Sequence, residues 1–229
     1  MHPGLFFLWV LSLGASLGAG CYVQWVFRRD GRFENRRQVN GYELARQVLD
    51  RNHLSQAAIE EGLKGSEPFS DHAGERLFLC EKIYRGTKLA DLAVSLHETI
   101  SFMDASQSLL PLSSFLKKGK FFQTVMIGSW ILILSGIFFP ALRGLASLGQ
   151  GLFVAAFLTA ALCLGKETEL MERSFSNLMA LEGLATDEMA RMKRLLKALL
   201  WNPWAAPWEA PLIFFKNRGK TSRKCLTKI

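Results

Sequence analysis

The organisation of the chain is decided by residues 121–165, which read FFQTVMIGSWILILSGIFFPAL-R-GLASLGQGLFVAAFLTAALCLG. Arg143 is the one charged residue of this stretch, and it separates two apolar segments, 121–142 and 144–165. A third segment without Asp, Glu, Lys or Arg spans residues 3–27. A helix needs about 20 mainly apolar residues to cross the hydrocarbon core of a membrane. The sequence therefore predicts three transmembrane helices, of which the last two form a tight hairpin.

The overall composition does not show that uncharged residues are concentrated in these three segments. The protein has 229 residues, of which 49% are hydrophobic, and its 28 Lys and Arg against 20 Asp and Glu give a net charge of +8. All of these charges except that of Arg143 lie outside the three apolar segments, so the remainder has the charge density of a soluble protein surface. This pattern excludes both an ordinary soluble enzyme and a disordered basic protein. It predicts an integral membrane protein with one modest water-exposed body.

The distribution of basic residues predicts which side that body occupies. Lys and Arg near the ends of membrane spans mark the cytoplasmic side. Basic residues follow the first span and precede the second, at Arg28, Arg29, Arg32, Arg36, Arg37, Lys117, Lys118 and Lys120. We therefore expect the N-terminus outside, residues 28–120 inside, and a return to the inside at Lys166, in a bacterial inner membrane. Residues 1–27 are expected to remain as an anchor, because they lack the basic start and short apolar core of a signal peptide.

A fourth apolar stretch, residues 195–215, is interrupted by three prolines and crowded with tryptophans. Unsatisfied backbone groups are costly in hydrocarbon, and Trp favours the membrane interface. A crossing here would also place the basic tail outside, against the charge rule. We therefore predict that 201–229 comprises an interfacial or re-entrant Trp/Pro segment and a basic tail. The tail is expected to attract anionic lipid rather than nucleic acid, because no aromatic residues are interleaved with its charges.

The water-exposed residues predict a small α+β body. Residues 40–53 form a helix whose Asn40 and Glu43 make a capping box. Residues 57–83 contain turn formers and the apolar run Leu77–Cys80, which indicate a small hairpin or strand pair. Residues 87–107 place apolar side chains at steps of three and four, so one stripe of that helix faces a core. Two further helices are expected at 167–181 and 186–200.

One string within the 87–107 helix suggests chemistry, His97-Glu98-Thr99-Ile100-Ser101. Two His at positions i and i+4 of a helix can hold one zinc ion, with the Glu between them as general base. This string has the first His and the Glu, but Ser101 stands at i+4. Taken alone, the string is more often part of a structural helix face than of a metal site.

Several strings nevertheless occur together in a characteristic order, NGYELARQVLD from Asn40, SDH from Ser70, LFLCEKIYRG from Leu77 and LADLAVSLHE from Leu89. This ordered set resembles the membrane-bound neutral zinc metallopeptidases of the YugP type, which carry T-G-x-x-x-A-R, S-D-H-Y-D-P, L-S-P-x-x-Y and H-E-x-G-H-A-x-Q motifs. The resemblance runs from about Tyr22 to Leu200. It implies a mainly α-helical integral membrane protein with a small cytoplasmic zincin-like α+β body. It also implies zinc as the cofactor and peptide hydrolysis as the activity.

The resemblance assigns roles to individual residues. It implies that His97 is a zinc ligand, that Glu98 is the catalytic general base, and that a Glu after the hairpin, Glu169 or Glu172, is a further ligand. Ser101 stands where the family has its second His. His72 of the Ser-Asp-His turn is a weaker candidate ligand. Asp104 or His72 could substitute for the missing imidazole only if the fold brings either close.

A neutral hydroxyl is a poor zinc donor, and loss of one imidazole should remove several kcal/mol of the roughly 10–16 kcal/mol seen for structural zinc sites. We therefore favour a degenerate, non-proteolytic or weakly active relative in which zinc is weakly bound or absent. Two alternatives stay open, an active metallopeptidase with a substitute ligand and a membrane scaffold or assembly factor without metal. The expected partners are membrane lipid and a peptide or protein, with no nucleic acid.

Overall fold

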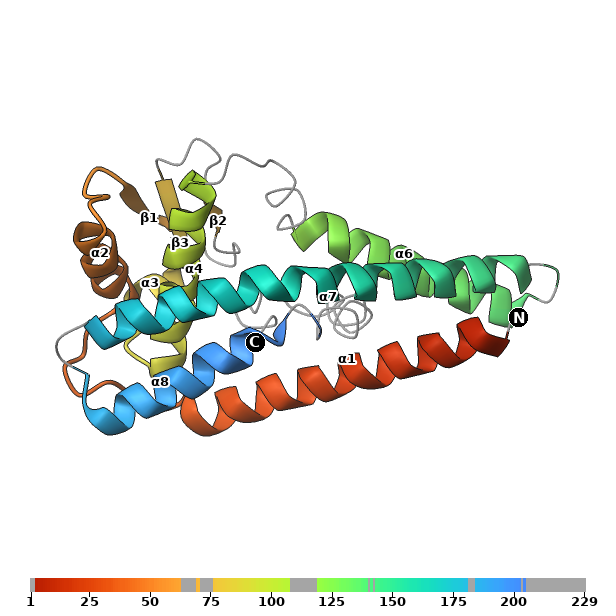
Figure 1. Ribbon diagram of the computed structural model, residues 1–229, viewed down its shortest axis with the longest axis horizontal. Coiled ribbons are helices and arrows are strands. Elements are labelled where there is room, and N and C mark those ends of the chain that lie inside the picture. The colour runs from red at the N-terminus through yellow and green to blue at the C-terminus, as the bar shows by residue number, and fades with distance from the viewer. Residues whose placement is uncertain are drawn as a thin grey trace. The chain divides into compact units, whose positions relative to one another are not determined.

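The elements of the chain follow one another as labelled in Figure 1. The computed structural model describes residues 3–62, 69–70, 76–107, 119–139, 141, 143–180, 184–202 and 204. These residues fall into two units, the first within Met1–Tyr22, Leu110–Leu164 and Trp201–Lys220, and the second within Val23–Leu109 and Gly165–Leu200. Helices α1 (Pro3–Asp30) and α7 (Arg143–Ala180) contribute residues to both units.

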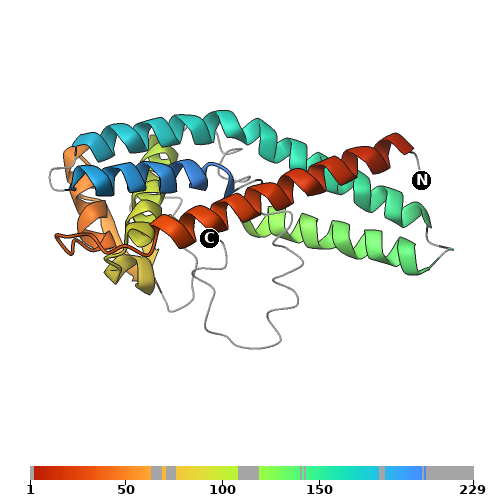
Figure 2. The same ribbon diagram turned by 90° about the horizontal axis from the view of Figure 1, so that it is seen from below.

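The first unit contains the helical hairpin expected from residues 121–165, formed by α6 (Gly119–Phe138) and the start of α7 (Figure 2). Small residues let these two helices approach closely. A Cβ atom added at Gly149 would lie 2.7 Å from the carbonyl oxygen of Ser129, and one added at Gly136 would lie 2.5 Å from the Cβ of Ala146. Small residues at helix–helix contacts are typical of membrane proteins, where close backbone packing replaces the hydrophobic effect.

The described helices of the first unit carry apolar side chains outside as well as inside. Its interior includes edge-to-face contacts of the Trp130 ring with Trp9 and Phe153, at centroid distances of 6.2 and 5.9 Å. Large apolar side chains also point outward from all three helices, including Phe6, Phe7, Leu8, Leu11, Ile131, Leu134, Ile137, Leu148, Leu158 and Leu162. A helix that is apolar all round is either buried in a large core or surrounded by lipid.

Within the described residues, α1 is the one helix that is long and apolar enough to cross a membrane by itself. The apolar part of α6 that the structure describes, Val125–Phe138, is shorter than a span requires. A first spanning helix therefore agrees with the sequence, whereas the crossing of the hairpin stays a prediction.

The core of the second unit is built around α4 (Leu89–Gln107). The apolar stripe predicted for this helix lies in the core. Its partly buried member is Met103, and its buried members are Leu89, Leu92, Ala93, Leu96 and Ile100. Helix α2 (Gly41–Arg51) packs on α4 and begins with the predicted capping box. The Asn40 Oδ1 accepts from the Glu43 amide at 2.9 Å, and the Glu43 Oε2 accepts from the Asn40 amide at 3.1 Å.

The start of α2 explains why a glycine follows Asn40. A Cβ at Gly41 would lie 2.0 Å from the carbonyl oxygen of Ile83, in the short helix α3 (Glu81–Arg85). The hydroxyl of Ser95 on α4 donates to the Gly41 carbonyl at 2.6 Å. Any side chain here would separate α2 from α3 and α4, so Gly41 fixes the packing of three helices.

The sheet is larger than the predicted strand pair. It contains β1 (Ala58–Gly62), β2 (Phe69–Ser70) and β3 (Arg76–Cys80) in the order β1-β3-β2. The apolar run predicted as a strand becomes the central strand β3, antiparallel to β2 and parallel to β1. Sequence reasoning missed β1 because its residues, AIEEG, are polar and because a parallel pairing depends on a distant partner rather than on a turn signal.

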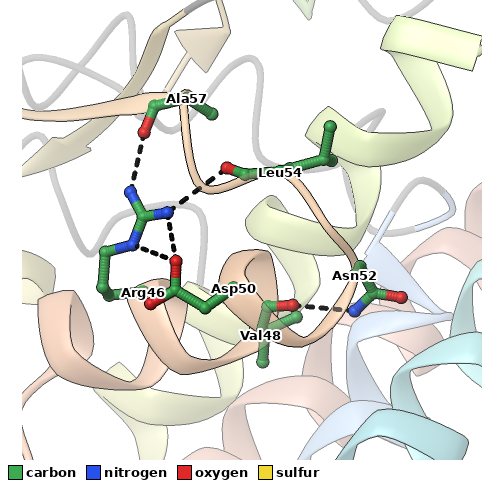
Figure 3. A network of polar contacts seen from close by, with 6 residues as sticks. All are labelled: Arg46, Val48, Asp50, Asn52, Leu54 and Ala57. Atoms are coloured by element: carbon green, nitrogen blue, oxygen red, sulfur yellow. Dashed lines mark hydrogen bonds and ion pairs between the residues drawn. The ribbon is translucent and has the colours of Figure 1, made fainter.

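Arg46 ties α2 to β1 through a network drawn in Figure 3. Its Nη1 donates to the Ala57 carbonyl at 2.9 Å, and its Nη2 donates to the Leu54 carbonyl at 3.3 Å. Its Nε also donates to Asp50 Oδ1 at 2.9 Å, and the guanidinium lowers the pKa of that carboxyl. The arginine of the N-G-x-x-x-A-R string is thus a structural residue that holds the connection between helix and strand.

Replacing Arg46 by Met should lower the free energy of unfolding by about 1.5–3 kcal/mol, because two main-chain carbonyls lose a charged donor. Thermal unfolding of the detergent-purified protein measures this loss. Arg85→Met is the matched control, since Arg85 binds Glu61 in an exposed pair that contributes about 1 kcal/mol at most. Equal destabilisation by the two variants would contradict the structural role of Arg46.

The later helices agree with the sequence except at one junction. Helix α8 (Thr186–Leu199) is confirmed, with Met192, Leu195 and Leu199 buried. Two separate helices were expected on either side of Lys166, but α7 continues without interruption from Arg143 to Ala180. No proline stands at the junction, and a glycine such as Gly165 costs a helix interior only about 1 kcal/mol.

Candidate functional site

His97 lies on α4 at the edge of its buried stripe, and its side chain is 21% exposed. Its Nε2 lies 3.3 Å from Oε2 of Glu167, which comes from the part of α7 in the same unit and is 18% exposed. The Glu98 carboxylate lies on the other side of the ring, with Oε1 3.9 Å from the His97 Nδ1. One imidazole is therefore flanked by two carboxylates in a largely water-excluded place.

These surroundings determine the charge of His97. Burial lowers the pKa of the imidazole, but the hydrogen bond to Glu167 and the negative charges of Glu98 and Glu167 raise it more, to about 10. At neutral pH the ring therefore carries a proton on each nitrogen. In this arrangement, His97 and Glu167 form an ion pair that joins α4 to α7.

The two Glu residues proposed from the sequence as further ligands lie elsewhere. Glu169 accepts from the Nη2 of Arg173 at 2.7 Å, and its side chain is 60% exposed. Glu172 is also exposed. The α7 residue that the structure brings to His97 is instead Glu167.

A helical stripe identifies Glu167 in retrospect. The residues of α7 that face the core of the second unit include Leu170, Ser174 and Leu178, all buried. Glu167 lies three residues before Leu170 and seven before Ser174, so it shares their face. Glu169 and Glu172 lie off this face. The spacing of the apolar residues after Lys166 therefore indicates that Glu167, and not Glu169 or Glu172, faces the core.

The remaining candidates do not complete the site. Asp104 lies 3.3 Å from the Nη1 of Arg173, so its carboxylate is engaged in an ion pair. Ser101 lies one turn after His97 on α4 and is half-buried. His72, in the Ser70-Asp71-His72 turn, lies outside the described residues.

The distance between the donor atoms of His97 and Glu167 tests whether both could bind one zinc ion. Two ligands of tetrahedral zinc at 2.0–2.2 Å lie about 3.3–3.5 Å apart. The His97 Nε2 and Glu167 Oε2, at 3.3 Å, match one edge of such a site. A catalytic zinc needs a third protein ligand, and among the residues that the structure describes no group of three His, Cys, Asp or Glu side chains could hold a metal ion. Among the described residues, which do not include His72, His97 and Glu167 therefore supply two donors for a zinc ion, and the third ligand of a catalytic site is missing.

The His97–Glu167 pair should stabilise the fold in a pH-dependent way. Because the pKa of about 10 in the folded protein exceeds the ordinary 6.5, the contribution is complete below pH 6.5 and is lost as the pH rises toward 10. His97→Gln should therefore cost roughly 1.5–3 kcal/mol of unfolding free energy at pH 6 and much less at pH 10.

Denaturant unfolding of wild type and His97→Gln across this range measures the difference. Glu167→Gln is the matched variant, because it removes the partner charge and should give the same dependence on pH. A cost that stays constant from pH 6 to pH 10 would contradict the ion pair.

Comparison with known proteins agrees with the motifs of the sequence. The model of a family described as "Putative neutral zinc metallopeptidase" matches residues 5–201, which is most of the chain. No curated protein and no solved structure matches the chain. The match includes α1, the His97 helix, the hairpin and α8.

Proposed function

The chain belongs to the neutral zinc metallopeptidase family, and from that premise we propose that it is a degenerate member that does not cleave peptides. In this proposal it keeps the family's helical body and membrane anchor but lacks the catalytic zinc. Such a protein binds a peptide or protein partner, or supports an assembly, without hydrolysing it. The membrane position and the site support different parts of the proposal.

The proposal for the site rests on one arrangement. His97 pairs with Glu167, and Ser101, one turn later on the helix, offers only a hydroxyl group. Zinc binds only a deprotonated imidazole, so it would have to displace any proton that His97 shares with Glu167. It would then find two strong donors instead of three. Glu98 would have no metal-bound water to deprotonate, and a lone carboxylate is a poor activator of water.

The membrane arrangement is the second part of the proposal. In this proposal, residues 3–27, 121–142 and 144–165 cross the membrane, the N-terminus lies outside, and the body faces the cytoplasm of a bacterium. The outward-facing apolar side chains of α1, α6 and α7 and the close contacts at Gly136 and Gly149 support three lipid-embedded helices. The basic residues that follow α1 support the orientation.

Elemental analysis of detergent-purified protein tests the loss of the ligand. We expect wild type to contain far less than one zinc per chain, and Ser101→His to approach one, because an imidazole at i+4 restores the third donor. The double variant Ser101→His with His97→Ala is the control, and its zinc content should fall back to that of wild type. Stoichiometric zinc in wild type, or no gain in Ser101→His, would refute the proposal.

An active peptidase with a substitute ligand is the second candidate, favoured by the 3.3 Å separation of the His97 and Glu167 donor atoms. The two candidates differ in peptide cleavage. We expect purified wild type and Glu98→Gln to be equally inactive on unstructured peptides, with and without a chelator. Chelator-sensitive cleavage by wild type that disappears in Glu98→Gln would establish the active enzyme instead.

A further inference from the structure

The end of α1 carries a dense group of arginines that the proposed function does not use. Five of the ten residues from 28 to 37 are arginine, and all five are exposed, namely Arg28, Arg29, Arg32, Arg36 and Arg37. They follow directly on the apolar part of the helix. If α1 crosses the membrane, its last turn lies at the level of the lipid headgroups.

Asp30, the acid between the first three arginines, forms its ion pairs with another helix. Asp30 is 2% exposed and faces inward, where its carboxylate accepts from Arg194 at 2.8 Å and from Arg191 at 3.3 Å, both on α8. Arg36 pairs with Asp187 at 3.2 Å. Within the described part of the chain, Arg28, Arg29 and Arg32 form no ion pair. Because α8 supplies the ion-pair partners of the buried acid, these three guanidinium groups stay exposed at the surface, although the charge of Arg29 also acts on Asp30.

An aromatic side chain stands beside them. Trp25 is 55% exposed, although it lies on the same helix as the buried Val23 and Val26. The guanidinium carbon of Arg29 lies 5.1 Å from the centre of the Trp25 ring. Trp prefers the interface between hydrocarbon and headgroups, and a stacked guanidinium keeps its outer N–H groups available for a second partner. The helix thus presents an interfacial aromatic ring and an oriented cation together.

We propose that Trp25, Arg28, Arg29 and Arg32 form a binding site for the phosphodiester of anionic phospholipids, which we name the arginine collar. The Trp25 ring contacts the acyl–headgroup boundary, and the guanidinium forks donate paired hydrogen bonds to phosphate oxygens. Neutral phospholipids carry a cationic group beside their phosphate, so charge selects the anionic ones. This inference rests on the membrane position of α1 in the proposed function, and it is independent of zinc.

The test uses the full chain purified in a neutral detergent and titrated with phosphatidylglycerol or phosphatidylcholine, with bound lipid counted by native mass spectrometry. Wild type should bind phosphatidylglycerol in preference to phosphatidylcholine. The triple variant Arg28→Gln, Arg29→Gln, Arg32→Gln should bind phosphatidylglycerol about a hundredfold more weakly, since each basic residue contributes about fivefold. Trp25→Leu should lose part of the affinity, because Arg29 loses the ring that orients it.

Two controls make the result specific. The variant Lys82→Gln, Arg85→Gln, Lys88→Gln removes the same charge from exposed positions on and after α3, and it should bind phosphatidylglycerol like wild type. Inorganic phosphate at millimolar concentration should not displace the lipid. Equal binding by wild type and the collar variant, equal loss in the control variant, or displacement by phosphate would each overturn the proposal. The zinc content of the collar variant should equal that of wild type, so the two proposals fail separately.

Discussion

The ion pair between His97 on α4 and Glu167 on α7 is the contact on which this account of the protein depends. An imidazole between two carboxylates can hold a proton or, once deprotonated, a metal ion. The separation of its nitrogen from the Glu167 oxygen, 3.3 Å, suits either arrangement. In the proposed function, the outcome depends on the side chain one turn later on α4, Ser101, because a hydroxyl is a poor zinc donor.

Helix α4 is held by contacts other than the His97–Glu167 pair. These are its buried stripe, the Ser95 hydroxyl bonded to Gly41, and the packing of α2 and α8. In the proposed function, Ser101 replaces a zinc ligand while these contacts keep the fold. The same separation holds at the end of α1, where Asp30 joins α8 from inside while the arginine collar faces outward. Asp30 thus stabilises the fold there, and the arginine collar supplies the charge of the surface.

Features that depend on neighbours along the chain could be predicted from the sequence. The Asn40 capping box, the stripe of α4 and the start of α8 each depend on residues within a few positions of one another. Features that depend on distant partners could not be predicted in this way. Strand β1 pairs with a strand that lies beyond β2, and its polar residues gave no alternation to detect. That Glu167, and not Glu169, lies beside His97 was accessible from the sequence, because it follows from the helical phase of Leu170 and Ser174 within the expected helix 167–181.

Nitrogen-15 NMR of the His97 ring, in protein labelled at histidine and supplied with one equivalent of zinc at pH 7.5, tests this account most directly. The chain has four His residues, so comparison with His97→Gln assigns the signal. The account predicts that both ring nitrogens resonate as in an imidazolium and do not shift when zinc is added. A shift of Nε2 to the position of a neutral, metal-bound imidazole would contradict it.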